Sequence, residues 1–315
     1  MMKILTCILR RASLLLSTIL LLAACGSGDS AGTDTNLVTL KITDAPVDDA
    51  DDVWVEFSSV TFKSADDEDF SFNLDPVQRI NLMALQGSES QTLLENVEIP
   101  AGNYNQIRLA VNAEFDSVMD SYITINGTAY ELRVPSGSQS GLKLNTPFTI
   151  AEGTNGMSVA DDNSVYTIDF DLRKSIVNPV GQPGYFLKPV LRLVQNINTG
   201  TISGTVDSQL LVGTNCSDQD PLTGNSVYVF AGENITPDDI DGNEPEPVTT
   251  ALVNFNNQSG IYSYEVGFLP EGSYTLALSC SADLDDIETD DSDVLFDAVD
   301  NVSVVAGENT EHNIN

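Results

Sequence analysis

The sequence predicts an all-β protein built from two antiparallel β-sandwich domains that follow an N-terminal secretory segment. Apolar and polar residues alternate with a period of two along most of the chain, which is the pattern of half-buried strands. Loops rich in Gly, Pro, Asn and Asp separate these runs at short intervals, as in sandwiches and barrels. Asn126-Gly127 lies between two alternating runs and fits the positive-φ positions of a type I′ hairpin turn.

Residues 37–197 are predicted to form the first domain. Its first strand is expected at residues 38–42, and strands at residues 165–172 and 185–194 are expected to close it. The segment with the weakest strand pattern, residues 80–94, is the one place where a helix is predicted.

A change of parity marks one strand of this domain. Val55 and Phe57 share one face, whereas Val60 has the opposite parity. Such a switch around Ser58 and Ser59 is typical of a β-bulge, which inserts one extra residue into a strand. We therefore expect one long bent strand here rather than two separate strands.

Residues 198–315 are predicted to form the second domain, again from short alternating strands. One six-residue pattern occurs in both domains. Ile-Pro-Ala-Gly-Asn-Tyr at residues 99–104 is echoed by Leu-Pro-Glu-Gly-Ser-Tyr at residues 269–274. Shared turn chemistry explains the echo, since Pro and Gly suit successive turn positions. Descent of two related sandwiches from one is the alternative explanation.

The N-terminus has the layout of a secretory signal peptide over residues 1–24. Basic residues precede an apolar stretch at residues 12–22, which is shorter than the roughly 20 residues needed to span a bilayer core. The stretch ends in Leu22-Ala23-Ala24-Cys25, which resembles the lipobox of bacterial lipoproteins. The resemblance implies acylation of Cys25, with palmitate among the chains added, and a flexible tether over residues 25–36.

Ordinary signal cleavage after Ala24 is the alternative, but Leu22 is not the small residue that this route prefers. By the sorting logic of diderm bacteria, Gly26 rather than Asp after the cysteine favours the outer membrane. We therefore expect a lipid-anchored protein of the cell envelope, with the membrane as its first partner. The face of the membrane is not encoded in any of these residues.

The mature chain is strongly acidic. The full sequence holds 13 Lys and Arg against 47 Asp and Glu, and cleavage removes three basic residues and no acid, leaving a balance of 10 against 47, or −37. Repulsion from phosphates argues against nucleic acid as a partner. An envelope protein or a carbohydrate is the expected ligand class.

Two cysteines, Cys216 and Cys280, remain after Cys7 leaves with the signal peptide and Cys25 takes the lipid. An even pair in an oxidising compartment predicts a disulfide within the second domain. Two buried free thiols are the alternative.

The first domain resembles a bacterial and archaeal lipoprotein family known as domain of unknown function 4382. The matching motifs occur in a consistent order: Thr43-Asp44-Ala45-Pro46, residues 99–104, Val134-Pro135-Ser136-Gly137, Asp169-Phe170-Asp171 with Lys174-Ser175, and Leu187-Lys188-Pro189-Val190. The second domain looks like the carboxypeptidase-regulatory, prealbumin-like sandwich, through Gly204-Thr205-Val206, Pro221-Leu222-Thr223-Gly224, residues 269–274 and residues 302–308. The resemblances imply an immunoglobulin-like or prealbumin-like extracytoplasmic accessory and assign no activity.

No residue pattern predicts catalysis or a cofactor. His312 is the single histidine and is expected in a frayed C-terminus, which is a poor setting for a catalytic imidazole. Residues 137–141 differ from a nucleophile elbow by one position. A hydrolase or lyase acting on polysaccharide through an acid pair remains the alternative to a binding module, because 47 acids allow such a pair by chance.

Five aspartates are the candidate ligands for a structural calcium ion, which prefers carboxylate and carbonyl oxygens. Asp169 and Asp171 lie two apart on one predicted strand, opposite Ile168 and Phe170. They are equally suited to pair with Lys188 or Arg192. The other three candidates belong to the acid-dense loop at residues 283–293: Asp283, Asp285 and Asp286. Plain solvated acidic loops are the alternative for this set.

Overall fold

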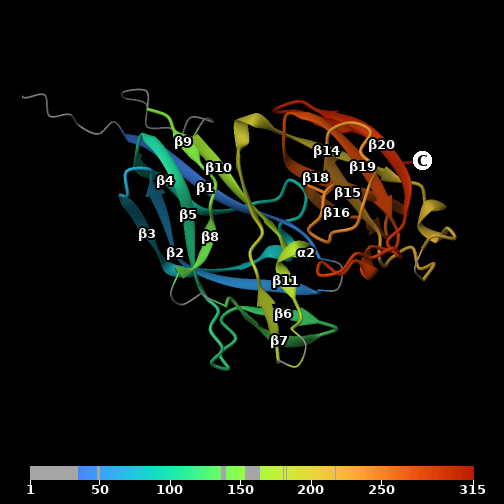
Figure 1. Ribbon diagram of the computed structural model, residues 1–315, viewed down its shortest axis with the longest axis horizontal. Coiled ribbons are helices and arrows are strands. Elements are labelled where there is room, and N and C mark those ends of the chain that lie inside the picture. Colours follow the sequence, from blue (N-terminus) through green and yellow to red (C-terminus); the bar gives the residue numbers. More distant parts are fainter. Residues whose placement is uncertain are drawn as a thin grey trace, which may run out of the picture. The chain divides into compact units, whose positions relative to one another are not determined.

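The computed structural model describes residues 35–47, 50–135, 140–152, 164–179, 181, 183–216 and 218–315. These residues belong to one compact unit, residues 34–315. Strands make up 55% of the described residues and helices 7%, which confirms the all-β prediction. Figure 1 shows the strands of the first sandwich in blue to yellow-green and those of the second in yellow to red.

The first sandwich packs two sheets face to face. One has the order β13-β10-β1-β4 and the other the order β11-β12-β7-β6-β2-β5-β8, with β3 added beside β2 and β9 beside β5. The strands of the first sheet are β1 (Thr35–Ala45), β4 (Gln91–Pro100), β10 (Val165–Asp171) and β13 (Leu191–Gln195). Those of the second are β2 (Asp52–Ser64), β3 (Asp69–Asn81), β5 (Gly102–Asn112), β6 (Tyr122–Ile125), β7 (Thr128–Arg133), β8 (Leu142–Leu144), β9 (Phe148–Ile150), β11 (Ile176–Val177) and β12 (Tyr185–Leu187).

A continuous apolar core fills the space between these sheets. Val38, Leu40 and Ile42 of β1 are fully buried in it, as the alternation predicted. Phe57 and Phe170 meet edge to face across the core, with ring centroids 6.3 Å apart. Burial of such side chains contributes about 1.5–3 kcal/mol each, which is the main force that holds the sheets together.

The second sandwich has its own core, centred on Ile202, Val229 and Leu276. Its sheets have the orders β17-β18-β14-β21 and β16-β15-β19-β20. The strands are β14 (Thr199–Val206), β15 (Ser226–Ala231), β16 (Thr249–Leu252), β17 (Asn254–Asn256), β18 (Ile261–Pro270), β19 (Gly272–Ser279), β20 (Phe296–Val304) and β21 (Asn309–Glu311). The two sandwiches have separate cores within one compact unit, and the division into two domains near residue 198 stays a prediction.

The two sandwiches share a topology. In the first, β1 pairs antiparallel with β4 and parallel with β10, and β2 pairs with β5 in the facing sheet. In the second, β14 pairs antiparallel with β18 and parallel with β21, and β15 pairs with β19 in the facing sheet. These parallel pairs differ from the purely antiparallel sheets that the sequence predicted. Local sequence patterns do not reveal them, because each pair joins strands far apart in the chain.

The repeated six-residue pattern is the point where the chain crosses between sheets in both sandwiches. It joins β4 to β5 in the first and β18 to β19 in the second. The hydroxyl of Tyr104 donates a hydrogen bond to the carbonyl of Pro100 (2.7 Å), and that of Tyr274 donates to the carbonyl of Pro270 (2.7 Å). Burial raises the pKa of Tyr104 to about 12, so its hydroxyl stays a donor.

Two local predictions are confirmed. The pairing register of β2 shifts between Phe57 and Ser59, as expected for a bulge. Asn126 and Gly127 both have positive φ (49° and 71°) between β6 and β7, as the type I′ hairpin requires.

Two local predictions are wrong, and a third, a strand that is present, extends one residue too far. Residues 80–94 contain no α-helix: they cover the end of β3, a single 3-10 turn at Leu82–Ala84 and the start of β4. The strand expected at residues 185–194 divides into β12 and β13, in different sheets, because Pro189 cannot donate to a strand ladder. The strand expected at residues 165–172 ends at Asp171, where one helical turn, α2 (Leu172–Ser175), begins.

Candidate functional site

The predicted acid pair lies where the first sandwich contacts the second. Parallel pairing of β1 with β10 places Thr43 opposite Asp169 and Ala45 opposite Asp171. Both aspartates are buried, with 6% and 7% of their surface exposed. Because the second sandwich covers this face, the outward side of β10 is as buried as its core side.

Each acid of the pair has a cationic or capping partner. Arg192 on β13 reaches Oδ2 of Asp169 with Nη2 (2.5 Å) and Nε (3.2 Å). Asp171 accepts a hydrogen bond from the amide of Lys174 (3.1 Å), which caps α2, and lies 3.8 Å from its Nζ. The ion-pair alternative with Arg192 is therefore what the structure adopts, whereas Lys188 contacts Glu288 on the surface (3.0 Å).

Asp44 is the exception among the buried acids. Only 5% of its surface is exposed, and neither carboxylate oxygen accepts a hydrogen bond within the described part of the chain. Burial raises the pKa of Asp44 well above its ordinary value, and the charges of Asp169 and Asp171 add to the effect. The amide of Leu172 lowers the pKa of Asp44, although it is not in hydrogen-bonding geometry with the carboxylate.

A small polar cavity of about 240 Å³ opens beside these acids. Thr43, Asp169 and Glu265 line it, and Ser88 donates to Oε1 of Glu265 through its amide (2.8 Å) and its hydroxyl (2.5 Å). Ligand pockets usually measure about 300–1,000 Å³ and are mainly apolar. The cavity is small and polar by comparison.

Arg173 of α2 ties the two sandwiches together. Its guanidinium is buried (4% exposed) and donates to the Oγ1 of Thr250 (3.2 Å), the carbonyl of Ala282 (3.0 Å) and the Oγ of Ser226 (2.8 Å). It also lies 5.5 Å from the ring centroid of Tyr228. The turn that follows the acidic motif Asp169-Phe170-Asp171 therefore supplies the side chain that links the sandwiches.

The three loop candidates for calcium differ in their surroundings. Oxygens of Asp239, Asp285 and Asp291 lie within 4.8 Å of one another, a spacing that a cation could bridge. Of these three aspartates, the sequence predicted only Asp285 as a calcium ligand. Asp283 and Asp286 lie outside this group of three, and Asp169 and Asp171 lie elsewhere in the fold.

Each acid of this group already accepts hydrogen bonds. Asp285 accepts from the hydroxyl of Tyr228 (2.6 Å) and the amide of Ile240 (3.2 Å), and Asp239 accepts from the amide of Asp291 (2.7 Å). Burial raises the pKa of Asp285 to about 6, against the effects of Tyr228 and Arg173. Calcium binding here stays a prediction.

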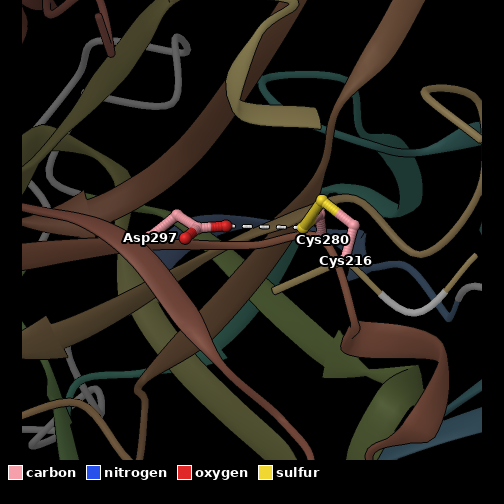
Figure 2. Close-up of side chains that lie close together, drawn as sticks. All are labelled: Cys216, Cys280 and Asp297. Carbon is pink, nitrogen blue, oxygen red and sulfur yellow. Dashed lines mark hydrogen bonds between the residues drawn. A yellow bond between two sulfur atoms is a disulfide. The ribbon is translucent and has the colours of Figure 1, made fainter. Parts of the chain in front are cut away.

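The disulfide joins Cys216 to Cys280, with Cα atoms 4.7 Å apart. Figure 2 shows the carboxylate of Asp297 directed at the sulfur of Cys280, 3.5 Å away. The predicted pairing is therefore present, and the alternative of two buried free thiols is wrong.

The C-terminus is ordered rather than frayed, contrary to the expectation for His312. The amide of His312 donates to Ser203 of β14 (2.8 Å), and its ring lies 3.2 Å from Asp300. A Cβ on Gly204 would overlap the carbonyl of His312, so glycine permits this close approach. No described acid or hydroxyl other than Asp300 is shown beside the imidazole.

Cys25 and residues 136–139 of the serine-containing loop lie outside the described residues. Within the described ranges, no helix combines the length and apolarity needed to cross a membrane.

The fold and junction define a protein of tandem all-β sandwiches, with buried Asp44 and Asp169 lining a cavity where the sandwiches meet. Residues 35–189 match the model of the family described as domain of unknown function (DUF4382). The match agrees with the resemblance that the motifs of this part of the chain predicted. No curated protein matches the chain.

Likenesses to solved structures are weak. A leucine-rich repeat protein from Bacteroides thetaiotaomicron shares 10% identity at a TM-score of 0.20, over 89% of this chain and 26% of that protein, so the chain spans about a quarter of its length. The minor pilin of Streptococcus agalactiae shares 11% identity at a TM-score of 0.19, over 88% of this chain and 94% of that protein. A Bacteroides ovatus protein proposed to be an adhesin shares 8% identity at a TM-score of 0.21, over 89% of this chain and 93% of that protein. TM-scores of this size carry no inference about function.

Proposed function

We propose that this protein is a non-catalytic lipoprotein of the cell envelope, anchored through a lipid on Cys25 and acting as a binding, adhesion or structural accessory module. The observation that carries the non-catalytic part is the use of the motif acids. Asp169 holds Arg192, and Asp171 caps α2 beside Lys174. Both acids are buried and are held by partners within the first sandwich.

The anchor is supported by the sequence Leu22-Ala23-Ala24-Cys25 behind an apolar stretch. Replacing Cys25 with Ser should abolish acylation and release the protein from the membrane fraction, measured by palmitate labelling and cell fractionation. Cys7→Ser is the matched control, because Cys7 lies within the signal peptide and should have no effect. A Cys25→Ser protein that is still labelled and still sediments with membranes would refute the anchor.

Outer-membrane placement is supported by Gly26 after the lipidated cysteine. Density-gradient separation of the two membranes tests it directly. Digestion of intact cells with a broad-specificity protease then assigns the face, since a surface-exposed body is degraded and a periplasmic one is protected until the outer membrane is opened.

The binding role is supported by a mature charge of −37, which excludes phosphate-rich ligands and favours neutral glycans or basic protein surfaces. A panel of envelope polysaccharides and envelope extract, presented to the immobilised full-length protein, separates these classes. Failure to retain either class would leave the structural accessory role.

A polysaccharide hydrolase or lyase is the alternative, and one observation favours it. Asp44 and Asp169 are neighbouring buried carboxylates with unequal environments, because burial raises the pKa of Asp44 whereas Arg192 holds Asp169. Unequal pairs are used as acid and base in glycosidases. Release of reducing ends from any envelope polysaccharide, lost in Asp44→Asn and Asp169→Asn, would establish the enzyme and overturn the non-catalytic proposal.

A further inference from the structure

An apolar surface on the first sandwich has no role in the fold or in the junction. Large apolar side chains gather in the loop between β5 and β6, where Phe115, Val118 and Met119 are 58%, 49% and 44% exposed. Three large apolar residues exposed within five positions are unusual on a soluble surface, where such residues are normally scattered singly.

The loop is held in this conformation by buried polar contacts. Oε1 of Glu131, a residue only 8% exposed, accepts hydrogen bonds from the amides of Asp116 (3.0 Å) and Ser117 (2.9 Å). Ser117 has a φ of 67°, a conformation that non-glycine residues adopt at a cost. The amide of Val118 donates to Oδ1 of Asp116 (2.9 Å). The exposed apolar side chains are therefore presented by a built loop.

Aromatic contacts extend the surface onto the neighbouring strands. The guanidinium of Arg133 on β7 lies 4.1 Å from the ring centroid of Phe115 and 4.7 Å from that of Phe186 on β12. Tyr130 and Tyr185, with ring centroids 5.6 Å apart, alternate with Arg133 and Phe186 along the same strands and therefore lie on the other face of the sheet. Aromatic residues, Met and Arg are the residue types enriched at the centres of protein interfaces.

The charges around this surface indicate its partner. Glu114, Asp116 and Asp120 alternate with the apolar residues of the loop, whereas Arg133 lies against two of its rings. Anionic lipid would be repelled by this arrangement, and interfacial insertion usually relies on Lys and Arg instead. Phe115 has the only flat ring among the three exposed apolar residues of the loop, and the guanidinium of Arg133 already covers one face of that ring.

We propose that the surface formed by Phe115, Val118, Met119 and Arg133 docks a protein segment that is apolar at its centre and carries Lys or Arg at its edges. The proposal deepens the binding role proposed above, because it names the class of partner and the face of the first sandwich that receives it. Anchoring through Cys25 does not enter it, so failure at the loop leaves the anchor and its test unchanged.

The test uses the full-length protein in lipid nanodiscs and a matched pair of labelled synthetic peptides. Both peptides have the same leucines in an amphipathic pattern, and one carries Lys where the other carries Glu. Fluorescence anisotropy against empty nanodiscs as the blank should give binding of the Lys peptide at least about tenfold tighter than that of the Glu peptide.

Two variants separate this surface from the general attraction of an acidic protein for a basic peptide. The double variant Phe115→Ser with Val118→Ser changes no charge. It should weaken binding of the Lys peptide by about tenfold or more, which is about 1.4 kcal/mol or more of binding free energy. Leu222→Ser is the control, because Leu222 is 61% exposed on the second sandwich and should leave binding unchanged. Circular dichroism confirms that both variants are folded, and Met119→Ser alone serves if the double variant is not.

Equal binding of the Lys peptide to the wild type and to the loop variants would overturn the proposal, since charge alone would then account for the affinity. Equal binding of the two peptides would overturn the basic character of the partner. Self-association of the protein at micromolar concentration that disappears in the loop variant would assign the surface to a second copy and overturn it as well.

Discussion

Removal of the Arg173 side chain should cost the protein much of its stability. Three hydrogen bonds run from this buried guanidinium into the second sandwich, at 2.8, 3.0 and 3.2 Å. A hydrogen bond to a charged group contributes roughly 1.5–3 kcal/mol, but burying the charge offsets part of the total. We therefore expect Arg173→Ala to lower the free energy of unfolding by about 3–5 kcal/mol.

Chemical denaturation of the full-length protein, followed by the fluorescence of Trp54, measures this change. Trp54 is half-buried on β2 and stacks with Tyr122, so its emission reports on the first sandwich. Near-ultraviolet circular dichroism adds a signal from the tyrosines of both sandwiches, including Tyr228, Tyr262, Tyr264 and Tyr274 of the second, where there is no tryptophan. Loss of the junction should also separate the two transitions, because the sandwiches would no longer unfold together.

Three further variants make the result specific. Arg173→Met keeps most of the side-chain volume and should lose nearly as much stability as Arg173→Ala. Arg173→Lys should recover part of that stability, because it keeps the positive charge. Arg108→Ala is the control, because the Nε of Arg108 bonds to Gln106 on its own strand, away from the junction. A loss below about 0.5 kcal/mol in Arg173→Ala, the size of an ordinary surface substitution, would refute the assignment of Arg173 as the tie between sandwiches.

Three other outcomes follow from the site. Replacing Cys216 and Cys280 with Ser should cost on the order of 4 kcal/mol or less, measured by denaturation, because the bridge closes a loop with a sequence separation of 64; an unchanged midpoint would contradict this. Millimolar calcium should raise the melting temperature more than sodium chloride of matched ionic strength, and Asp285→Asn with Asp291→Asn should remove the excess; equal shifts would leave only screening. Burial raises the pKa of Asp285 to about 6, so the folded state binds a proton more tightly than the unfolded one, and stability from this group is present below pH 4 and falls as the pH rises through 6. The loss is on the order of 3 kcal/mol for about two pH units, and Asp285→Asn should become more stable relative to the wild type between pH 4 and pH 8; a constant difference across that range would contradict the shift.

Local patterns predicted most of the strands and the disulfide because they depend on neighbouring residues or on the compartment. Period-two alternation determines which face of β1 is buried, and Asn126-Gly127 can form its turn without help from distant chain. The break between β12 and β13 at Pro189 could also have been predicted from the sequence, since proline has no amide hydrogen to donate to a strand ladder. The helix prediction at residues 80–94 failed because tertiary pairing with β2 and β1 overrides weak local preference.

The junction could not be predicted, because it depends on pairing between distant strands. Nothing local to Thr43-Asp44 indicates that β1 pairs with β10, about 125 residues later. One signal for Asp44 was present: it continues the even parity of Val38 and Ile42, and therefore the buried face. Arg173 gave no such signal, since a charged residue after an acidic motif is usually exposed. Asp239 and Asp291 meet Asp285 only through the fold of their loops.

The shared topology bears on the origin of the repeated six-residue pattern. Turn chemistry alone explains Pro, Gly and the Tyr hydroxyl, because the crossover leaves a proline carbonyl that Tyr104 or Tyr274 satisfies. It does not explain why the strand before each crossover also pairs in equivalent register, with Thr35 opposite Pro100 and Thr199 opposite Pro270. Nor does it require a late strand of each sandwich, β10 in the first and β21 in the second, to pair parallel with the first strand. Agreement in features that the turn does not dictate favours two related sandwiches.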